Sequence, residues 1–599
     1  MHPKVATYDD LSEPTKFSSD NSYVGGWLRF LSVLALSSKL LYNPSFFLNI
    51  LLSIDPAIIM AIQKFGLLHL VGAATVIAFV ISKTTESSLL AVLPWIYLAT
   101  IPAYLFIYLS YIYPYYISDL RHVPTVPGFP LWGQFFEIIT TEIGVSQRRW
   151  HQEHGPIIRY FFPFGNERLS IADDKAIHQM TVKNPYNYPK PVRAKLWMVR
   201  ILGEGVLLAE GSEHVHQRKA LAPGFSIGSI RALTPVFWSK ALLLSKLWKE
   251  EMAASRVNTK CFEVLEWLNR TTLDIIGQAG FGTDINSLEN PETPIREAYR
   301  LVFAFDIGSR ILHGAQAFIP STKYIPAKMN RDMEAARNII VDTATDIITE
   351  KEDQAAVHSK HKDIIALIAK DNLKMKEAGE AGLSFETMRD QVMTFLGAGH
   401  DTTATGVAWT LHLLSTHQEI QSRLRDEVRA HMPFLFDENM RYDAAELAKA
   451  DCDLLPYMDN VCRESLRYIP PIPMTVRESI ADDRLGEYNV PVGTVIYVMA
   501  NAINRLPMYW CPTADEFDPD RWDNLPSTYT TNAFMTFLQG PRGCVGRKFA
   551  ETEMKIILCC LLSVFTFERD LHVEDPETLK MWRLVLRPRD GVSLKTTLL

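Results

Sequence analysis

Cysteine is scarce in this 599-residue chain, and the cysteines that are present do not form a recognisable pairing pattern. The seven are Cys261, Cys452, Cys462, Cys511, Cys544, Cys559 and Cys560. No two of them have the C-x-x-C spacing of a zinc site, and the chain is too long to need a disulfide scaffold. The pattern favours reduced thiols in a domain that faces the cytosol.

Other absences narrow the function further. Lys and Arg number 61 against 68 Asp and Glu, so the net charge of -7 argues against a nucleic-acid partner. No internal repeat or low-complexity tract appears. The chain also lacks a strand–GxGxxG–helix unit, since the G-F-G at Gly280–Gly282 does not complete that pattern, which excludes a flavin or nicotinamide domain of its own.

One apolar run is long enough to cross a bilayer. Leu89–Ile117 holds 29 residues without a charge, and a span needs about 20. Its prolines are tolerated better in a transmembrane helix than in a soluble one. Gly66–Ser82 adds 17 uncharged residues, and the short linker KTTESS predicts a helical hairpin, with transmembrane helices at 66–82 and 89–117. A single span at 89–117 remains the alternative.

The segment before this hairpin, residues 1–65, is expected to be a tail with amphipathic segments that lie on the membrane. It lacks the pattern of a cleaved signal, which favours an anchor. With two spans both ends face one side, and Lys39, Lys64 and Arg121 indicate that this side is the cytosol.

The rest of the chain predicts one large domain. Residues 121–133 form a proline-rich hinge that cannot be helical, and 134–599 show mostly helical periodicity with small strand-like islands. The strands are expected within Arg159–Asp173 and Glu487–Ala500. Helices are expected at Pro235–Met252, Phe262–Gly277 and Pro456–Tyr468, two of them opening with a proline at the first helical position.

The longest predicted helix runs from a cap at Ser384 to about His417, with Glu386 in its first turn. Poor helix formers cluster in its middle: Gly397, Gly399, Asp401, Thr402 and Thr403. Glycines here either let a flat group approach the backbone or mark a crossing point in the core.

A second unusual segment is FLQGPRGCVGRKFA, Phe537–Ala550, which surrounds Cys544 with glycines and cations. Glycine permits tight backbone and close approach of a large flat object. Cations lower the pKa of a thiol and favour the thiolate, which is the form that binds metal. This segment therefore predicts that Cys544 acts as a ligand, although the segment taken alone also fits an inert buried thiol.

Together these segments resemble the cytochrome P-450 family of haem-thiolate monooxygenases. Phe537, Gly540, Arg542, Cys544 and Gly546 match its F-x-x-G-x-R-x-C-x-G signature. The long helix matches A-G-x-D-T-T as Ala398, Gly399, Asp401, Thr402 and Thr403. Glu464 and Arg467 match E-x-x-R, and FDPDRW supplies Arg521. The match covers about 120–599 and implies a mainly α fold with small β-sheets after N-terminal transmembrane helices.

The resemblance implies haem b with Cys544 as the thiolate axial ligand. Phe537 would pack near the sulfur, and Gly540 and Gly546 would let the loop lie against the porphyrin. Arg542, Arg218 and Arg477 would bind the haem propionates. His214 stands where the family has a tryptophan, so its contribution is expected to depend on pH. Glu464, Arg467 and Arg521 would form a buried charge network for folding and haem retention.

The resemblance also implies roles in catalysis. Thr402 would hydrogen-bond dioxygen and its associated water, and Asp401 would link that network to solvent, so that loss of Thr402 diverts reduced oxygen to peroxide. Electrons would come from a membrane-bound NADPH–cytochrome P-450 reductase, with cytochrome b5 as a second partner. Arg547, Lys548 and Lys219 would either form its docking face or be ordinary solvated charges.

The implied function is a membrane-anchored enzyme of the endoplasmic reticulum, facing the cytosol, that inserts oxygen into a lipophilic small molecule. Substrate contacts are expected from Tyr186–Leu208, Leu301–Tyr324, Phe395–Thr402, Ile472–Val476 and Leu584–Leu586. The motifs resemble those of fungal members, many of which tailor secondary metabolites. Two alternatives stay open: a haem-thiolate isomerase or dehydratase that needs no reductase, and a non-catalytic membrane haem-binding protein. Retention of Asp401 and Thr402 argues against the first, and intact Cys544 and Glu464 argue against the second.

Overall fold

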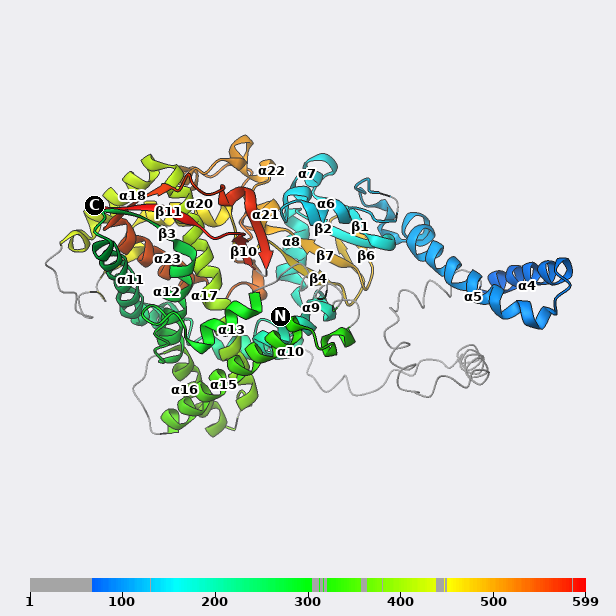
Figure 1. The fold of residues 1–599 in the computed structure, drawn as a ribbon, viewed down its shortest axis with the longest axis horizontal. Coiled ribbons are helices and arrows are strands. Elements are labelled where there is room, and N and C mark those ends of the chain that lie inside the picture. The colour runs from blue at the N-terminus through cyan, green and yellow to red at the C-terminus, as the bar shows by residue number, and fades with distance from the viewer. Residues whose placement is uncertain are drawn as a thin grey trace, which may run out of the picture. The chain divides into compact units, whose positions relative to one another are not determined.

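The computed structural model describes residues 67–129, 131–303, 312, 316, 320–356, 363–379, 381–437, 447, 450–583 and 585–599 (Figure 1). The chain divides into two compact units, residues 1–105 and 106–599. The predicted N-terminal tail, 1–65, lies outside the described residues.

The N-terminal unit contains the predicted helical hairpin. Helices α4 (Leu67–Thr84) and α5 (Leu89–Ile107) follow each other closely, and Thr75 Oγ1 lies 2.7 Å from Tyr97 Oη across the pair. Helix α5 continues as a π-helical segment, Tyr108–Ile117. Among the described residues, Leu89–Ile117 is the one helix long and apolar enough to cross a membrane. That the chain crosses a membrane, with one helix or with two, stays a prediction.

The segment expected as a hinge, residues 121–133, is part of the larger unit and is fixed within it by backbone hydrogen bonds. Thr125 bridges to Arg159, whose carbonyl accepts from the Val126 amide at 2.8 Å. The prediction that no part of 121–133 is helical is wrong at its start, because the short 3₁₀ turn Asp119–His122 is capped by the Ser118 hydroxyl. From Val123 to Phe129 the described chain is extended or irregular, as its prolines require.

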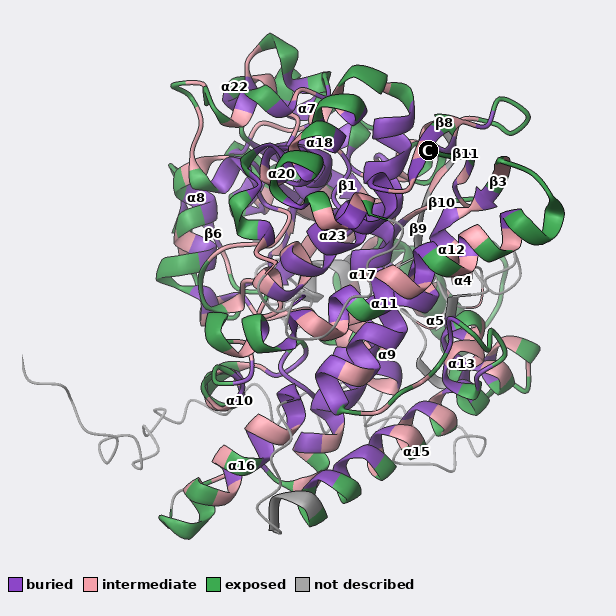
Figure 2. Ribbon diagram, turned by 90° about the vertical axis from the view of Figure 1, so that its left-hand side faces the viewer, coloured by how far each residue is buried: buried purple, intermediate pink, exposed green. Residues whose placement is uncertain are grey.

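The larger unit is mainly helical. Its α-helices are α6 (Phe135–Thr140), α7 (Val145–His154), α8 (Asp174–His178), α9 (Val192–Leu202), α10 (Gly211–Leu221), α11 (Ile227–Ser255), α12 (Val264–Ile275), α13 (Pro294–Phe303), α15 (Lys328–Ala356), α16 (Ile364–Glu377), α17 (Phe385–Thr416), α18 (Gln418–His431), α20 (Pro456–Tyr468), α21 (Ala500–Ile503), α22 (Pro507–Trp510) and α23 (Arg547–Leu562). Helix α17 is buried along most of its length (Figure 2).

Small sheets lie beside these helices. The strands are β1 (Ile157–Phe162), β2 (Asn166–Ile171), β3 (Thr259–Glu263), β4 (Thr475–Glu478), β5 (Asp483–Leu485), β6 (Tyr488–Val490), β7 (Val495–Val498), β8 (Phe565–Arg569), β9 (Lys580–Arg583), β10 (Val585–Pro588) and β11 (Ser593–Leu598). Their orders are β1-β2-β7-β4, β3-β11-β8, β10-β9 and β5-β6. Strands β1 and β2 pair antiparallel from Ile157↔Ile171 to Phe162↔Asn166, as the sequence predicts for this segment.

The predicted helices are confirmed with two differences. Helix α11 begins at Ile227, so Pro235 lies inside it and not at its first position. The chain tolerates this because the Thr234 hydroxyl donates to the Arg231 carbonyl at 2.9 Å, which is the carbonyl that a residue at 235 would otherwise satisfy. Phe262 ends strand β3, and helix α12 starts after it at Val264.

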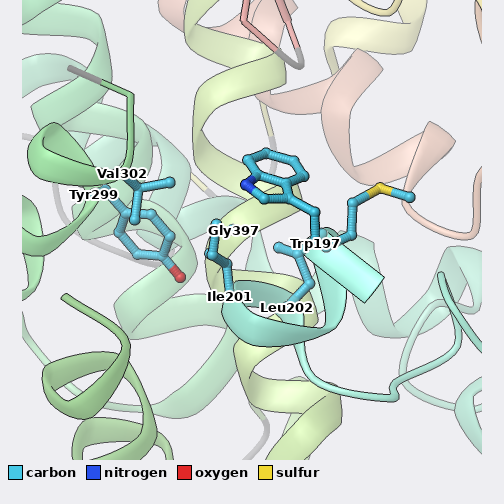
Figure 3. A pocket seen from close by; sticks show the side chains of 7 residues that line it. Trp197, Ile201, Leu202, Tyr299, Val302 and Gly397 are labelled. Carbon is cyan, nitrogen blue, oxygen red and sulfur yellow. The ribbon is translucent and has the colours of Figure 1, made fainter. Parts of the chain in front are cut away.

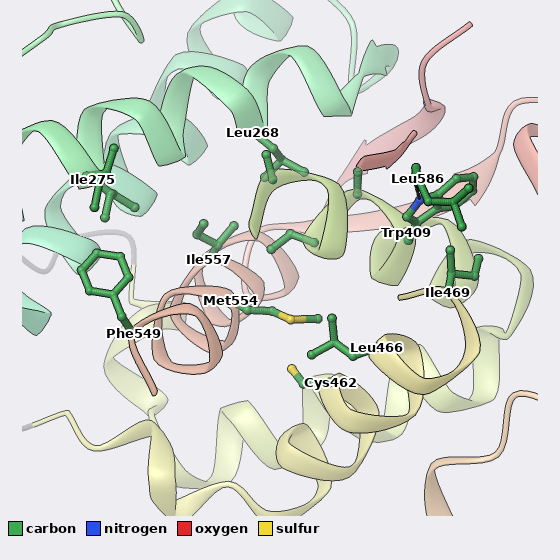
Figure 4. Close-up of a cluster of buried hydrophobic side chains, with 14 of the residues drawn as sticks. Leu268, Ile275, Trp409, Cys462, Leu466, Ile469, Phe549, Met554, Ile557 and Leu586 are labelled. Atoms are coloured by element: carbon green, nitrogen blue, oxygen red, sulfur yellow. Dashed lines mark hydrogen bonds between the residues drawn. The ribbon is translucent and has the colours of Figure 1, made fainter. Parts of the chain in front are cut away.

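The core brings α17, α20 and α23 together. Trp409 from α17, Leu466 from α20 and Met554 from α23 are buried in one cluster (Figure 4). Cys462 lies in the same cluster, and all seven cysteines of the chain are free thiols, as predicted. This packing places the middle of α17 and the loop before α23 within one interior.

Candidate active site

The Cys544 loop is a folded structure built on backbone hydrogen bonds. The Cys544 amide donates to the Phe537 carbonyl at 2.8 Å, and the Gly543 amide donates to the Gly540 carbonyl at 2.9 Å. Gly540 has φ +72°, and a Cβ there would lie 2.1 Å from the Thr181 carbonyl oxygen. Glycine is therefore required at 540 by the contact with Thr181 as well as by the backbone angle.

The electrostatics of Cys544 differ from the expectation that nearby cations lower its pKa. Protein atoms surround the loop, and this burial raises the pKa of the Cys544 thiol. The Gly546 amide, Arg218 and Arg547 offset part of the rise. Cys544 nevertheless keeps exposed surface. The thiol is thus surrounded by protein atoms but still has accessible surface. A metal cation bound to it would add the positive charge that lowers its pKa and favours the thiolate.

Four cations gather near this loop: Lys190, Arg218, Arg477 and Arg542, called here the cation cluster. The one carboxylate among them in the described chain is Glu210, which forms an ion pair with Arg542 and accepts from the Lys190 amide at 3.0 Å. Burial, with Arg542 adding to it, lowers the pKa of Arg477 to about 10. Burial and the neighbouring cations lower the pKa of Lys190 as well.

Arg542 shows that the cluster has unused hydrogen-bonding capacity. Its Nε donates to the Pro185 carbonyl at 3.1 Å, whereas its buried Nη1 has no partner among the described residues. A buried, unsatisfied guanidinium nitrogen is costly and points to an anionic ligand.

His214 and Arg218 lie on one helix, α10, beside the cluster. His214 is buried, and its Nδ1 lies 2.9 Å from Tyr186 Oη. Burial, then Arg542, lower the pKa of His214 to about 4. The expected pH dependence therefore does not fall near neutrality, where His214 is neutral. Arg218 Nη1 donates to the Gly543 carbonyl at 2.5 Å, directly before the cysteine.

A short stretch in the middle of α17 is less buried than the rest of the helix. Ala398, Gly399 and Thr402 keep partial exposure, while the residues around them on the helix are buried. Thr402 Oγ1 donates to the Ala398 carbonyl at 2.9 Å, so its oxygen remains able to accept.

The glycines of α17 allow close packing against neighbouring segments. A Cβ on Gly397 would lie 2.4 Å from Leu202 Cδ2, and one on Gly399 would lie 3.2 Å from Ile276 Cγ1. Their missing side chains allow α9 and the segment after α12 to approach α17, which fits a crossing point in the core. The approach of a flat group to the same backbone stays a prediction.

Asp401 is fully buried and forms an ion pair with Arg587 of strand β10. Its charged partner is thus an arginine, and the role of Asp401 as the link between the Thr402 network and solvent stays a prediction. Beside it, burial lowers the pKa of His400, so that this imidazole is neutral.

The predicted charge network is present and buried. Arg467 donates to both oxygens of Glu464, at 2.8 Å from Nε and 2.7 Å from Nη2. Arg521 Nε lies 3.3 Å from Glu464 Oε1, and the indole of Trp522 donates to Oε2 at 3.1 Å.

An apolar cavity of about 10 Å³ lies against α17 (Figure 3). Its lining residues are Trp197, Met198, Ile201, Leu202, Tyr299, Val302 and Gly397. Three of the segments expected to contact substrate therefore meet here, and Tyr299 joins them from just outside the expected range. The expected segment Leu301–Tyr324 and residue 584 fall partly or wholly outside the described residues.

Comparison with known proteins identifies the family. A profile of the Cytochrome P450 family matches residues 123–596, most of the chain. The protein is a cytochrome P450. The cytochrome P450 monooxygenase sphH of Aspergillus fumigatus is 32% identical over 504 residues, covering 82% of this chain and 90% of that protein. ALT8 of Alternaria alternata is 32% identical over 525 residues (77% and 87%) and buaD of Petromyces alliaceus 32% over 480 residues (78% and 85%).

As a cytochrome P450, the protein is a haem-dependent monooxygenase whose cofactor has a cysteine thiolate as axial ligand. The described residues fit that cofactor. The accessible thiol of Cys544 can supply the axial ligand, and the excess positive charge of the cation cluster suits the two carboxylates of a haem.

The two docking candidates on α23 are not free charges in this cytochrome P450. Arg547 pairs with Glu551 at 2.8 Å and Lys548 with Asp453 at 2.7 Å. Lys219 is exposed.

Four site residues escaped sequence reasoning: Lys190, Glu210, Glu553 and Arg587. Glu553 is fully buried on α23, and burial raises its pKa well above the usual value, while Thr403 offsets part of that rise. The one signal for Glu553 in the sequence is that it lies just before the apolar second half of α23, Ile556–Leu562. No local pattern marked the other three.

Proposed function

We propose that this cytochrome P450 is anchored in the endoplasmic-reticulum membrane by Leu89–Ile117, faces the cytosol, and oxidises a lipophilic small molecule in secondary-metabolite biosynthesis. Its electrons come from an NADPH-dependent flavoprotein reductase, since the chain has no flavin or nicotinamide fingerprint. The apolar segment of 29 residues supports the anchor, and the fungal relatives support the biosynthetic role.

The observation that carries the proposal is the Cys544 loop. The cysteine is accessible inside the fold, Arg218 holds the carbonyl just before it, and the cation cluster lies alongside. When haem is bound, Cys544 Sγ would ligate its iron, and Arg542, Arg477, Arg218 and Lys190 would bind its propionates. The haem, when bound, supplies the activation of dioxygen.

The protein's own residues then govern protons and substrate. Thr402 accepts and passes on a hydrogen bond on the accessible face of α17, and Asp401 supplies the proton behind it. Tyr299 and the apolar side chains from α9 and α13 exclude water and orient an apolar substrate against α17.

The test is the absorption spectrum of the dithionite-reduced, carbon-monoxide-bound protein, for wild type, Cys544→Ser and Cys261→Ser. Cys261 is also exposed but lies on strand β3, so its variant is the matched control. The red-shifted Soret band of thiolate-ligated haem is expected in wild type and Cys261→Ser and absent in Cys544→Ser. A wild-type band at the ordinary position, or the red-shifted band in Cys544→Ser, would refute Cys544 as ligand. NADPH-driven turnover only when reductase is added tests the electron source.

A further inference from the structure

Asp401 pairs with a residue that none of the sequence motifs contains. The guanidinium of Arg587, 186 residues further along the chain, donates to Asp401 Oδ1. The second oxygen, Oδ2, is buried and has no hydrogen-bond partner among the described residues. The two oxygens of one carboxylate therefore have different surroundings, and the difference is set by Arg587.

The strand that carries Arg587 is fixed to α17 beside this contact. The Trp409 indole donates to the Leu586 carbonyl at 2.9 Å, and the Leu586 amide donates to the Pro471 carbonyl at 2.7 Å. Figure 4 shows Trp409 and Leu586 side by side. Because the amide and the carbonyl of Leu586 are both hydrogen-bonded, the backbone next to Arg587 is fixed, and this keeps Arg587 in position to contact Asp401.

Arg587 also reaches towards the surface. Burial raises the pKa of Glu263, and the charge of Arg587 opposes that rise. Glu263 caps helix α12 and is partly exposed. The Arg587 side chain is 20% exposed and that of Asp401 0%. Arg587 thus lies between a buried carboxylate and one near solvent.

We propose that Arg587 is a positioning residue for proton delivery: it holds Asp401 Oδ1 and so leaves Oδ2 as the oxygen that takes up a proton and passes it to the Thr402 network. The guanidinium stays protonated and does not carry the proton itself. A bond from Oδ2 to hydrogen forms as a hydronium ion from solvent gives up a proton and becomes water. That bond breaks when the proton moves on to an acceptor at Thr402, whose own hydroxyl hydrogen is engaged by the Ala398 carbonyl. The inference rests on the proposed function.

The experiment uses the full-length holoenzyme with a flavoprotein reductase. It compares Arg587→Gln, Arg587→Lys, Asp401→Asn and the double variant Asp401→Asn/Arg587→Gln. Arg589→Gln is the matched control, because Arg589 is an exposed arginine near the same strand that pairs with Asp590 and Glu574. Three quantities are measured: the infrared C–O stretching band of the reduced carbon-monoxide complex, the solvent isotope effect on NADPH oxidation, and the peroxide released per dioxygen.

Arg587→Gln is expected to shift or split the C–O band, to raise the solvent isotope effect, and to slow the reduction of dioxygen beyond peroxide by about tenfold or more, since a positioned proton-transfer group contributes roughly 10²–10⁴-fold. Arg587→Lys should recover part of each change. In the Asp401→Asn background, Arg587→Gln should cause no further change in any of these measurements. If Arg587 served folding alone, its replacement would still have an effect in that background.

Equal values for Arg587→Gln, Arg589→Gln and wild type would overturn the inference, as would full additivity in the double variant. If Arg587→Gln does not fold, the comparison of Arg587→Lys with Arg589→Gln decides in the same way. A wild-type protein without the red-shifted Soret band overturns the proposed function as well. A normal band with unchanged Arg587 variants overturns this inference alone.

Discussion

Replacement of Arg467 by Gln tests how far the buried charge network holds the fold. Arg467 and Glu464 have no exposed side-chain surface. Besides Glu464, Arg467 donates to three backbone carbonyls: Asn504 at 2.9 Å, Ala514 at 2.7 Å and Glu516 at 2.8 Å. A glutamine at 467 removes the positive charge and cannot reach all of these acceptors, which then stay buried without donors.

The expected cost follows from these contacts. Breaking a buried ion pair by removal of one partner costs about 3–5 kcal/mol. Each buried carbonyl left without a donor adds about 1–3 kcal/mol, although the terms overlap because one guanidinium makes all the bonds. A loss of at least about 3 kcal/mol is a large part of the 5–15 kcal/mol that separates a typical folded protein from its unfolded state.

The measurements are the guanidinium unfolding midpoint and the haem content of the purified protein. Arg463→Gln is the control: it lies one turn earlier on α20, its side chain is 44% exposed, and its partner is Asp459 at 2.6 Å. A pair of this kind contributes about 1 kcal/mol or less. Arg467→Lys should lie between the two, because it keeps the charge and loses the fork of donors. Equal midpoints for Arg467→Gln and Arg463→Gln would refute the reasoning.

Two further predictions concern Glu553 and Gly540. Because the pKa of Glu553 is raised in the folded state, its favourable contribution is complete below its unfolded pKa of about 4.3 and is lost as the pH rises towards the folded value. Glu553→Gln should therefore gain stability relative to wild type as the pH rises from 4 to 8, and parallel unfolding curves would contradict this. Gly540→Ala places a Cβ 2.1 Å from the Thr181 carbonyl oxygen and should abolish the red-shifted carbon-monoxide band. Gly493→Ala shares the positive φ (+83°) but meets nothing within 4 Å, so it should lose only about 1–2 kcal/mol and keep the band.

The sequence predicted elements well wherever the signal is local. The Ser384 cap is confirmed, since its hydroxyl accepts from the Thr387 amide at 3.1 Å and α17 ends at Thr416. Prediction failed where a neighbour supplies what the local pattern lacks. Pro235 sits inside a helix because a threonine hydroxyl replaces the missing amide.

The same holds for electrostatics at the site. The sequence shows cations next to Cys544, and only the fold shows that burial outweighs them and raises the pKa of the thiol. It shows a histidine at 214, and only the fold shows that burial and Arg542 keep it neutral.

The sequence by itself determined the family, the cysteine loop, the helix that carries Asp401 and Thr402, and the charge network of Glu464 and Arg467, because each depends on residues a few positions apart. The tertiary structure decided which charges meet. Arg587 reaches Asp401 across 186 residues, and Glu210 lies among cations from separate segments. Such partners are chosen by how helices and strands pack, and the cost of a buried charge without a partner then fixes them in place.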